Sequence, residues 1–245
     1  MDNNPLSNFL AFLNSGGPAM WALLILSILS IGIVLERLFF FSKQHADPNR
    51  LLREIGERVS ADDVQGAAAV CDRERGMLPK ILQFGLFRAT KSRADISDAL
   101  SIALLEQLNL LEANLSIIGT VAVIAPFVGL FGTVLGIIRA FKDIALKGNS
   151  TPAVVAAGVS EALVTTAAGL AVAVIAVIFF NYFKSRIKAY NQEMIVAANK
   201  LAEMLHFHNT GAPIPTELYT PNAPAGRQVA APAPAPKPSG PATRP

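Results

Sequence analysis

Three long stretches of this sequence carry almost no charge, and they constrain the fold more than any other feature. The uncharged residues run from Pro18 to Leu35, from Ala113 to Ile138 and from Ala162 to Phe183. A helix of 18 or more residues rises about 27 Å or more, close to the ~30 Å hydrocarbon core of a bilayer. Only 16% of the residues are charged, whereas soluble domains have roughly 25%. The sequence therefore predicts an all-α membrane protein with three transmembrane helices.

Positive charges are distributed unevenly around these tracts. Residues 1–20 contain no Lys or Arg, residues 42–114 contain ten, and the residues after Phe183 contain seven. The positive-inside rule therefore predicts that the N-terminus lies outside and that the long loop and the C-terminus are cytoplasmic. Lys142 and Lys147, between the second and third tracts, argue mildly against this orientation. The start MDNNPLSNF has no basic n-region, so the first helix is expected to be an uncleaved anchor.

The helical pattern of the second and third tracts continues outside the membrane. Apolar residues recur at three- and four-residue steps from Ile96 to Leu111, and neither Gly nor Pro separates them from the second tract. We therefore expect one continuous helix from about Asp95 through the bilayer. The third tract is expected to begin its helix at Pro152, a favoured first helical residue, and to continue well past Phe183.

The other segments carry structural signals. Ser60 precedes two acids and is expected to cap the N-terminus of a helix in the long loop. Cys71 is the only cysteine, so it cannot form an intrachain disulfide, and we interpret it as an inert thiol. The chain after about Asn209 is rich in Pro and Ala, cannot bury a core and is predicted to be disordered.

Small residues form a face along the second tract. Pro126, Gly129, Thr133 and Gly136 recur at three- and four-residue steps, and Gly132 adds a small-residue seam with Gly136. Membrane helices use such residues to pack closely, because no hydrophobic force drives them together in lipid. Close packing leaves the hydroxyl of Thr133 and the helix-loosening Pro126 without an explanation.

Glu161 is the only charged residue between Lys147 and Lys184. A carboxylate at the centre of a membrane helix costs roughly 2.5–3.5 kcal/mol on insertion scales. Counting back from Lys184, Glu161 lies roughly 34 Å from the inner boundary, so it could be an interfacial carboxylate facing water. If it faces a protein cavity instead, it can take up and release protons. Thr165 shares its helix face, and Thr166 lies about 140° around the helix.

The sequence lacks the motifs of several other functions. The segment GLFGTVLG has no Lys-Ser/Thr ending and is not a phosphate-binding loop. His206 and His208 point to different helix faces, so we predict no metal site, and no cofactor is expected. No nucleophile–base arrangement occurs outside the membrane tracts, so an enzyme is not expected. The net charge of +3 follows from the topology and does not imply a nucleic-acid partner.

Two motifs in this order resemble the ExbB/TolQ/MotA proton-channel family, especially its ExbB and TolQ branches. They are GLFGTVLGI at 129–137 and SEALVTTAAGL at 160–170. The resemblance implies a homopentamer around a central pore, with inner single-span partners of the ExbD/TolR type. It also implies roles for individual residues. Thr133 and Thr166 align with the pore threonines of the family, and Glu161 aligns with its pore-associated glutamate. Independently of the resemblance, we also assign Thr165 to the proton path, because it shares the helix face of Glu161. The expected helix-packing face comprises Pro126, Gly129, Gly132, Gly136 and Gly169.

The resemblance also implies a function and a location. The chain would be a subunit of a proton-driven motor in a bacterial inner membrane, energising an envelope process such as TonB-dependent uptake. TolQ-like envelope maintenance with a TolA-like partner and gliding motility remain alternatives. Outside the family, the alternatives are a non-conducting membrane scaffold and a solute transporter, although three spans without an internal repeat fit a transporter poorly.

These inferences divide the chain into eight segments. They are a periplasmic N-terminus at 1–17, transmembrane helix 1 at 18–41, a cytoplasmic helical domain at 42–112, transmembrane helix 2 at 113–138, a periplasmic connection at 139–158, transmembrane helix 3 at 159–183, a cytoplasmic helix at 184–208 and the Pro/Ala-rich tail at 209–245.

Overall fold

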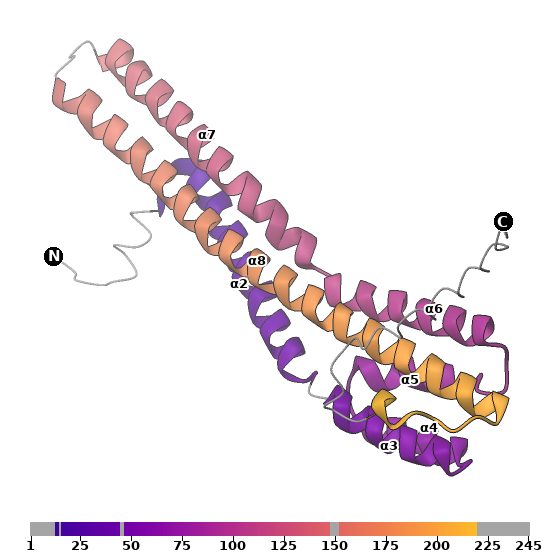
Figure 1. Cartoon of the computed structure of the whole chain (residues 1–245). Helices are drawn as coiled ribbons and strands as arrows, with labels where there is room; N and C mark the ends of the chain where they lie inside the picture. The colour runs from indigo at the N-terminus through magenta and orange to yellow at the C-terminus, as the bar shows by residue number, and fades with distance from the viewer. Residues whose placement is uncertain (1–12, 15, 45–46, 148–151, 220–245) are drawn as a thin grey trace, which may run out of the picture.

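Two long antiparallel helices run along the length of the molecule (Figure 1). The structure is a computed structural model that describes residues 13–14, 16–44, 47–147 and 152–219; within these ranges every regular element is a helix. The long pair is α7 (Leu115–Lys147) and α8 (Pro152–Thr210), with α2 (Gly17–Ser42) beside it. Four shorter helices lie beside the second half of α8 (Figure 1). They are α3 (Pro48–Ser60), α4 (Val64–Arg73), α5 (Met77–Leu86) and α6 (Arg93–Glu112). Three of them, α3, α5 and α6, pack directly on α8.

Three segments of the described chain are long and apolar enough to cross a membrane. They lie in α2, in the α6–α7 region and in α8. Large apolar side chains on these helices remain exposed in the single chain, for example Ile25, Phe127 and Ile178. Exposed apolar surface of this extent is stable in lipid but not in water. The prediction of an all-α, three-span membrane protein is thus confirmed by length and composition.

Helix α8 is continuous over 59 residues. It begins at Pro152, as expected from the sequence, and passes Phe183 without a break. Phe183 itself is fully buried and stacks on Phe41 of α2, with ring centroids 5.7 Å apart. One helix therefore belongs to both the apolar long pair and the shorter bundle. Most of the segment 139–158 is likewise helical, because α7 reaches Lys147.

The expected continuous helix from Asp95 through the second tract is wrong. The structure ends α6 at Glu112 and begins α7 at Leu115. Between them, Ala113 is extended (φ −52°, ψ 141°) and Asn114 is left-handed (φ 60°). Asn is one of the few non-glycine residues that adopt this conformation readily, because its short polar side chain can hydrogen-bond locally.

The shorter helices form a bundle with its own core. Ile55 and Val59 of α3, Ile81 and Leu82 of α5, and Leu201 of α8 are all completely buried. Burying each such side chain contributes roughly 1.5–3 kcal/mol. We call α3–α6 with the second half of α8 the extramembrane bundle.

Side-chain caps fix where the bundle helices begin. Asp47 accepts hydrogen bonds from the backbone amides of Asn49 and Arg50 at the start of α3. Asp63 accepts one from the amide of Gly66 and caps α4. The expectation that Ser60 caps a helix is wrong, since Ser60 is the last residue of α3 and donates to the Gly56 carbonyl. Arg58 and the left-handed Asp62 shape the turn that moves the cap to Asp63.

The chain after α8 folds back onto the bundle. Helix α8 ends at Thr210, and residues 211–219, which the sequence assigned to the tail, lie along α3 and α8. Gly56 of α3 leaves room for the ring of Tyr219, because a Cβ at residue 56 would lie 2.7 Å from that ring. We call residues 211–219 the C-terminal strap. Residues 220–245, the rest of the predicted tail, are outside the described residues.

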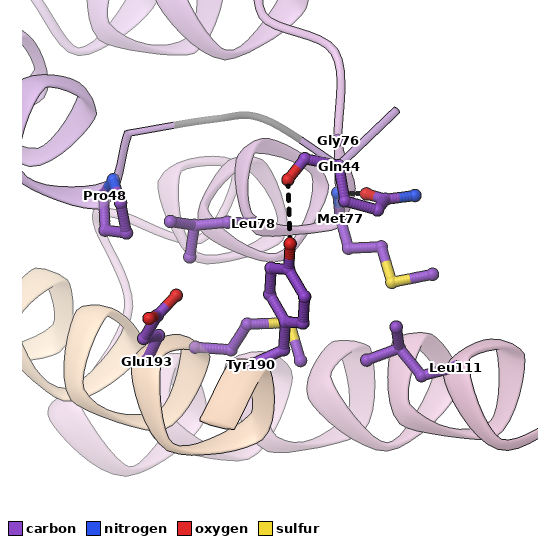
Figure 2. A pocket seen from close by; sticks show the side chains of 9 residues that line it. Gln44, Pro48, Gly76, Met77, Leu78, Leu111, Tyr190 and Glu193 are labelled. Carbon is purple, nitrogen blue, oxygen red and sulfur yellow. Dashed lines mark hydrogen bonds between the residues drawn. The ribbon is translucent and has the colours of Figure 1, made fainter. Parts of the chain in front are cut away.

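Gln44 joins α2 to the bundle and to α8. Its backbone carbonyl accepts a hydrogen bond from the hydroxyl of Tyr190 at 3.3 Å, and its side-chain oxygen accepts one from the amide of Met77 at 3.1 Å (Figure 2). The small cavity beside these bonds measures about 30 Å³, room for about one water molecule. These contacts are structural.

Cys71 lies in the bundle core and is buried. Burial, with a smaller effect from the charge of Asp72, raises the pKa of its thiol to about 12. The reactive thiolate is therefore not formed at neutral pH.

Candidate functional site

The site begins where α7 and α8 come closest. Gly129 of α7 faces Gly169 of α8, and neither position has room for a side chain. A Cβ at residue 169 would lie 2.7 Å from the carbonyl oxygen of Ala125 and 3.0 Å from the Cα of Gly129. One at residue 129 would lie 3.1 Å from the Cα of Thr166. The two backbones therefore touch directly, as small-residue motifs allow in membranes.

A pair of threonine hydroxyls bridges the helices next to this contact. The Oγ1 atoms of Thr133 and Thr166 are 3.0 Å apart. The Thr133 hydroxyl also lies 2.7 Å from the carbonyl oxygen of Leu130, and the Thr166 hydroxyl 3.0 Å from that of Gly129. Each hydroxyl has one proton and two lone pairs. The pair can therefore reorganise its hydrogen bonds, since either hydroxyl can donate to the other.

Thr165 lies on a different side of α8 from Thr166. Its side chain is completely buried, and its hydroxyl is 3.4 Å from the carbonyl oxygen of Glu161 one turn earlier. Gly132 of α7 and Gly16 before α2 make space for it, because a Cβ on either glycine would collide with the threonine side chain. Thr165 thus packs where α7, α8 and the start of α2 meet.

A cavity of about 470 Å³ lies between α7, α8 and the start of α2. Glu161 lines it, and in the single chain its side chain is exposed. Among the described residues no cationic group lies within 4.0 Å of this carboxylate. The cavity is large enough for several waters and has polar groups to bind them. The other lining residues are Gly16, Gly132, Gly136, Arg139, Ala140, Asp143, Ala157, Gly158, Ala162 and Thr165.

Two charged residues of this cavity were missed from the sequence. Arg139 and Asp143 follow the second uncharged tract directly and continue its Gly132–Gly136 face by one and two helical turns. Extending the three- and four-residue spacing past Ile138 could have found them. The guanidinium of Arg139 also packs on Gly17, where a side chain would collide with it, and that contact with α2 has no signal in the sequence.

The structure divides the predicted site residues into two groups. Thr133 and Thr166 meet beside the Gly129–Gly169 contact, whereas Glu161 and Thr165 line the cavity on another side of α8. The first group contains Thr166, which the sequence motif selected. The second group contains Glu161 and Thr165, which the helical spacing placed on one face. Gly136 packs on Ala162, and Pro126 lies inside α7, where it removes one backbone hydrogen bond.

No cluster of three or more His, Cys, Asp or Glu side chains that could hold a metal occurs within the described ranges. Of the two histidines considered above, His208 lies 3.3 Å from Asp62 in the turn after α3. That contact links the end of α8 to the bundle.

Comparison with known proteins gives consistent results. Residues 72–195, which include both groups of site residues, match the MotA/TolQ/ExbB proton channel family. Over 175 residues the chain is 31% identical to the biopolymer transport protein ExbB-like 3 of Synechocystis sp., covering 70% of this chain and 82% of that protein. Over 111 residues it is 38% identical to the Tol-Pal system protein TolQ of Pseudomonas aeruginosa, covering 45% of this chain and 48% of that protein.

The fold is also similar to a solved structure. The structure of C. jejuni MotAB superposes with a TM-score of 0.55 over 93% of this chain and 91% of that one. The sequence identity is 18%, so this similarity concerns the fold alone.

Proposed function

Because the chain belongs to the MotA/TolQ/ExbB proton channel family, we propose that it is the subunit of an inner-membrane motor that uses proton flow to energise an envelope process. The coarse role follows from the family. The process, the partner, the oligomer and the proton path are parts of the proposal, and each has its own support and test.

The observation that carries the proton path is the pairing of Thr133 with Thr166 beside the Glu161 cavity. A carboxylate can hold a proton, and hydroxyls can pass hydrogen bonds along. Between these groups α7 and α8 pack through small residues, so the carboxylate and the hydroxyls lie in a protein interface next to the cavity. A proton that crosses the membrane potential releases about 2.3 kcal/mol per 100 mV. Such a track allows protons to be transferred one at a time.

The exposed apolar surface of the long pair supports an oligomer. Phe127 and Phe131 of α7 and Leu163 and Val174 of α8 are exposed in the single chain. A helix pair with this surface can contact lipid, other copies or a partner helix. We assign five copies around a central pore that holds single-span partners of the ExbD/TolR type, each with a membrane aspartate.

The charge distribution supports the orientation. The N-terminus is placed in the periplasm, and the extramembrane bundle and C-terminus in the cytoplasm, because Lys and Arg concentrate in residues 42–114 and after Phe183. Under this orientation the Glu161 cavity faces the periplasm and the bundle faces the cytoplasm. A reporter fused after Phe207 should be active only in its cytoplasmic form. The opposite result would place the cavity on the wrong side.

TonB-dependent uptake is the process we assign, with TolQ-like envelope maintenance as the second candidate. The ExbB-like relative supports the first, and the 38% identity to a TolQ over 111 residues supports the second. The genes next to this one separate them: a TonB gene indicates uptake, and TolA or Pal genes indicate envelope maintenance. A cluster of gliding-motility genes would indicate the third alternative, a motor subunit for gliding.

The main experiment replaces Glu161 by Gln, which keeps size and hydrogen bonding but removes the titrating group. Co-expressed with a single-span partner of the ExbD/TolR type, the Glu161→Gln chain should lose its support of TonB-dependent uptake while its oligomer mass stays unchanged. Glu106→Gln, an exposed carboxylate on α6, is the matched control and should retain function. Full function in the Glu161→Gln strain would remove this residue from the path and favour the scaffold interpretation.

A second pair of variants tests the hydroxyls. Thr133→Val and Thr166→Val keep volume but remove a hydrogen bond worth about 1 kcal/mol, so transport should fall roughly fivefold or more. Thr120→Val is the control, since that hydroxyl donates to the Ser116 carbonyl within its own helix, α7. Equal effects at all three positions would indicate that the hydroxyl pair has no special part.

Assembly has a separate test. Purified in mild detergent, the full chain should have the mass of a closed oligomer, with five subunits expected. A monomer or dimer by mass measurement would contradict a central pore, whatever the Glu161 variant does.

A further inference from the structure

A buried arginine lies at the break between α6 and α7. Arg37 of α2 has only 4% of its surface exposed, although it is charged and follows an 18-residue apolar tract. Its Nη1 donates to the carbonyl oxygens of Leu110 and Leu111 at 3.1 and 3.3 Å. Its Nε and Nη2 donate to the carboxylate of Glu36. A cation at the C-terminus of a helix is favourable because of the helix dipole.

The two carbonyls that Arg37 holds have a second set of candidate donors. In a continuous α-helix they would accept from the amides of Asn114 and Leu115, four residues on. In the structure, and among the described residues, no hydrogen bond joins either amide to the carbonyl of Leu110 or Leu111. The guanidinium and these two amides therefore compete for the same two acceptors.

The local sequence favours the continuous alternative. No Gly or Pro occurs from Arg93 to Ile118, and the apolar spacing continues through the break. Asn114 adopts a left-handed conformation in the break, which costs Asn less than the 1–2 kcal/mol that it costs most L-residues. The break therefore combines a residue that tolerates it, Asn114, with a contact from another helix, since Arg37 binds the two carbonyls.

We propose that the α6–α7 junction is a two-state joint, in which Arg37 of α2 holds a break whose alternative is one continuous helix. When α2 moves away from the junction, the two carbonyls are released and α6 and α7 join into one rod. A rotation or shift of α7 in the membrane then reaches the extramembrane bundle through α6. With Arg37 in place, the joint separates the two motions. Arg37 is a positioning residue in this device, and the inference holds whichever envelope process the complex energises.

The first test changes the joint and leaves Arg37 intact. Hydrogen exchange is measured by mass spectrometry on peptides covering 110–118, with the full chain in nanodiscs. Asn114→Ala disfavours the left-handed state and should slow exchange of these amides relative to wild type. Asn114→Gly tolerates that state and should leave exchange unchanged. The two variants should differ by about fivefold, the ratio by which Ala and Gly differ in a helix interior.

The second test removes the guanidinium of Arg37. Arg37→Gln frees both carbonyls, so the Asn114 and Leu115 amides should exchange more slowly, although a buried hydrogen-bonding group has been lost. Adding Asn114→Gly to Arg37→Gln should restore wild-type exchange at the junction. A purely structural arginine predicts the reverse: faster exchange throughout the chain in Arg37→Gln, and no rescue by glycine.

The outcomes separate the interpretations clearly. Slower exchange in Asn114→Ala and Arg37→Gln, with restoration in the double variant, supports the joint. Equal exchange in Asn114→Ala and Asn114→Gly overturns it, because the conformational preference of residue 114 then has no influence on the break. If Arg37→Gln does not fold, the Asn114 pair still decides.

Discussion

The extramembrane bundle and the membrane pair of α7 and α8 solve the same packing problem in different solvents. In the bundle, Ile55, Val59, Ile81 and Leu82 are completely buried within one chain. In the most apolar window of α8, only 22% of the residues are buried. Water drives apolar side chains into a core, whereas lipid tails solvate them as well as protein does.

The difference shows what holds each half together. The bundle depends on the volume of its large side chains and on helix caps. The membrane pair depends on the absence of side chains, because Gly129 and Gly169 let two backbones touch, and on one hydroxyl pair. The pair of α7 and α8 is therefore destabilised by added atoms, whereas the bundle is destabilised by removed atoms. Most of the surface of α7 and α8 remains available for lipid or other chains.

The largest effect is expected from adding a side chain at the helix contact. Gly169→Leu would force α7 and α8 apart, because the nearest atoms are backbone that cannot move aside. Overpacking costs 1–3 kcal/mol, and we expect at least about 3 kcal/mol here. The folded chain should be lost in size-exclusion chromatography. Gly32→Leu in α2, where no atom of the described residues lies within 4 Å of the added Cβ, is the control and should elute normally. Normal elution of both would contradict the backbone contact.

Removing atoms should distinguish the two halves next. Ile81→Ala in the bundle should destabilise the chain by about 2–5 kcal/mol, since it leaves a cavity in a closed core. Ile25→Ala, the same change at an exposed position of α2, should have little effect, because lipid fills the space. Thermal unfolding in one detergent compares them. Equal losses would mean that α2 packs as tightly as the bundle.

The C-terminal strap defines the limit of the bundle. Tyr219→Ala removes the ring that packs at Gly56 and should cost about 1–2 kcal/mol. Deletion of 220–245 should leave the melting temperature unchanged, whereas deletion of 211–245 should lower it by as much as Tyr219→Ala or more. An identical melting temperature for both deletions would show that the strap contributes nothing.

The smallest effect concerns a surface cap in the bundle. A hydrogen bond from Arg58, and a further one from the amide of Gly66, hold the pKa of Asp63 below its ordinary value of 3.8. The stabilisation is therefore present above that value and is lost as the pH falls through the lower, folded-state pKa. Asp63→Asn keeps the cap but not the charge. On acidification from pH 5 to 3, the melting temperature of this variant should fall less than that of wild type. An equal fall in both proteins would show that Asp63 does not contribute to the pH dependence of stability.

Most of the candidate site could be predicted from the sequence, because its signals are local. Glu161 stands out in an uncharged tract, and Thr133 lies on a face of small residues that periodicity reveals. Arg139 and Asp143 could be predicted only by extending the Gly132–Gly136 face beyond the end of the uncharged tract at Ile138. The contacts of Gly16 and Gly17 with Thr165 and Arg139 could not be predicted, because they join segments more than 100 residues apart.

The sequence by itself determined the elements that depend on near neighbours. Hydrophobic length determines the three spans, and uninterrupted helical spacing determines the 59 residues of α8. Only the tertiary structure decided where helices stop when local preference gives no signal. The spacing from Arg93 to Ile118 predicts one helix, yet the helix breaks at Asn114, where Arg37, more than 70 residues earlier, donates to the carbonyls that a continuous helix would use. When a donor close in sequence and a donor far away can both bind the same carbonyl oxygen, tertiary packing decides which of them does. The local spacing of apolar residues does not encode that choice.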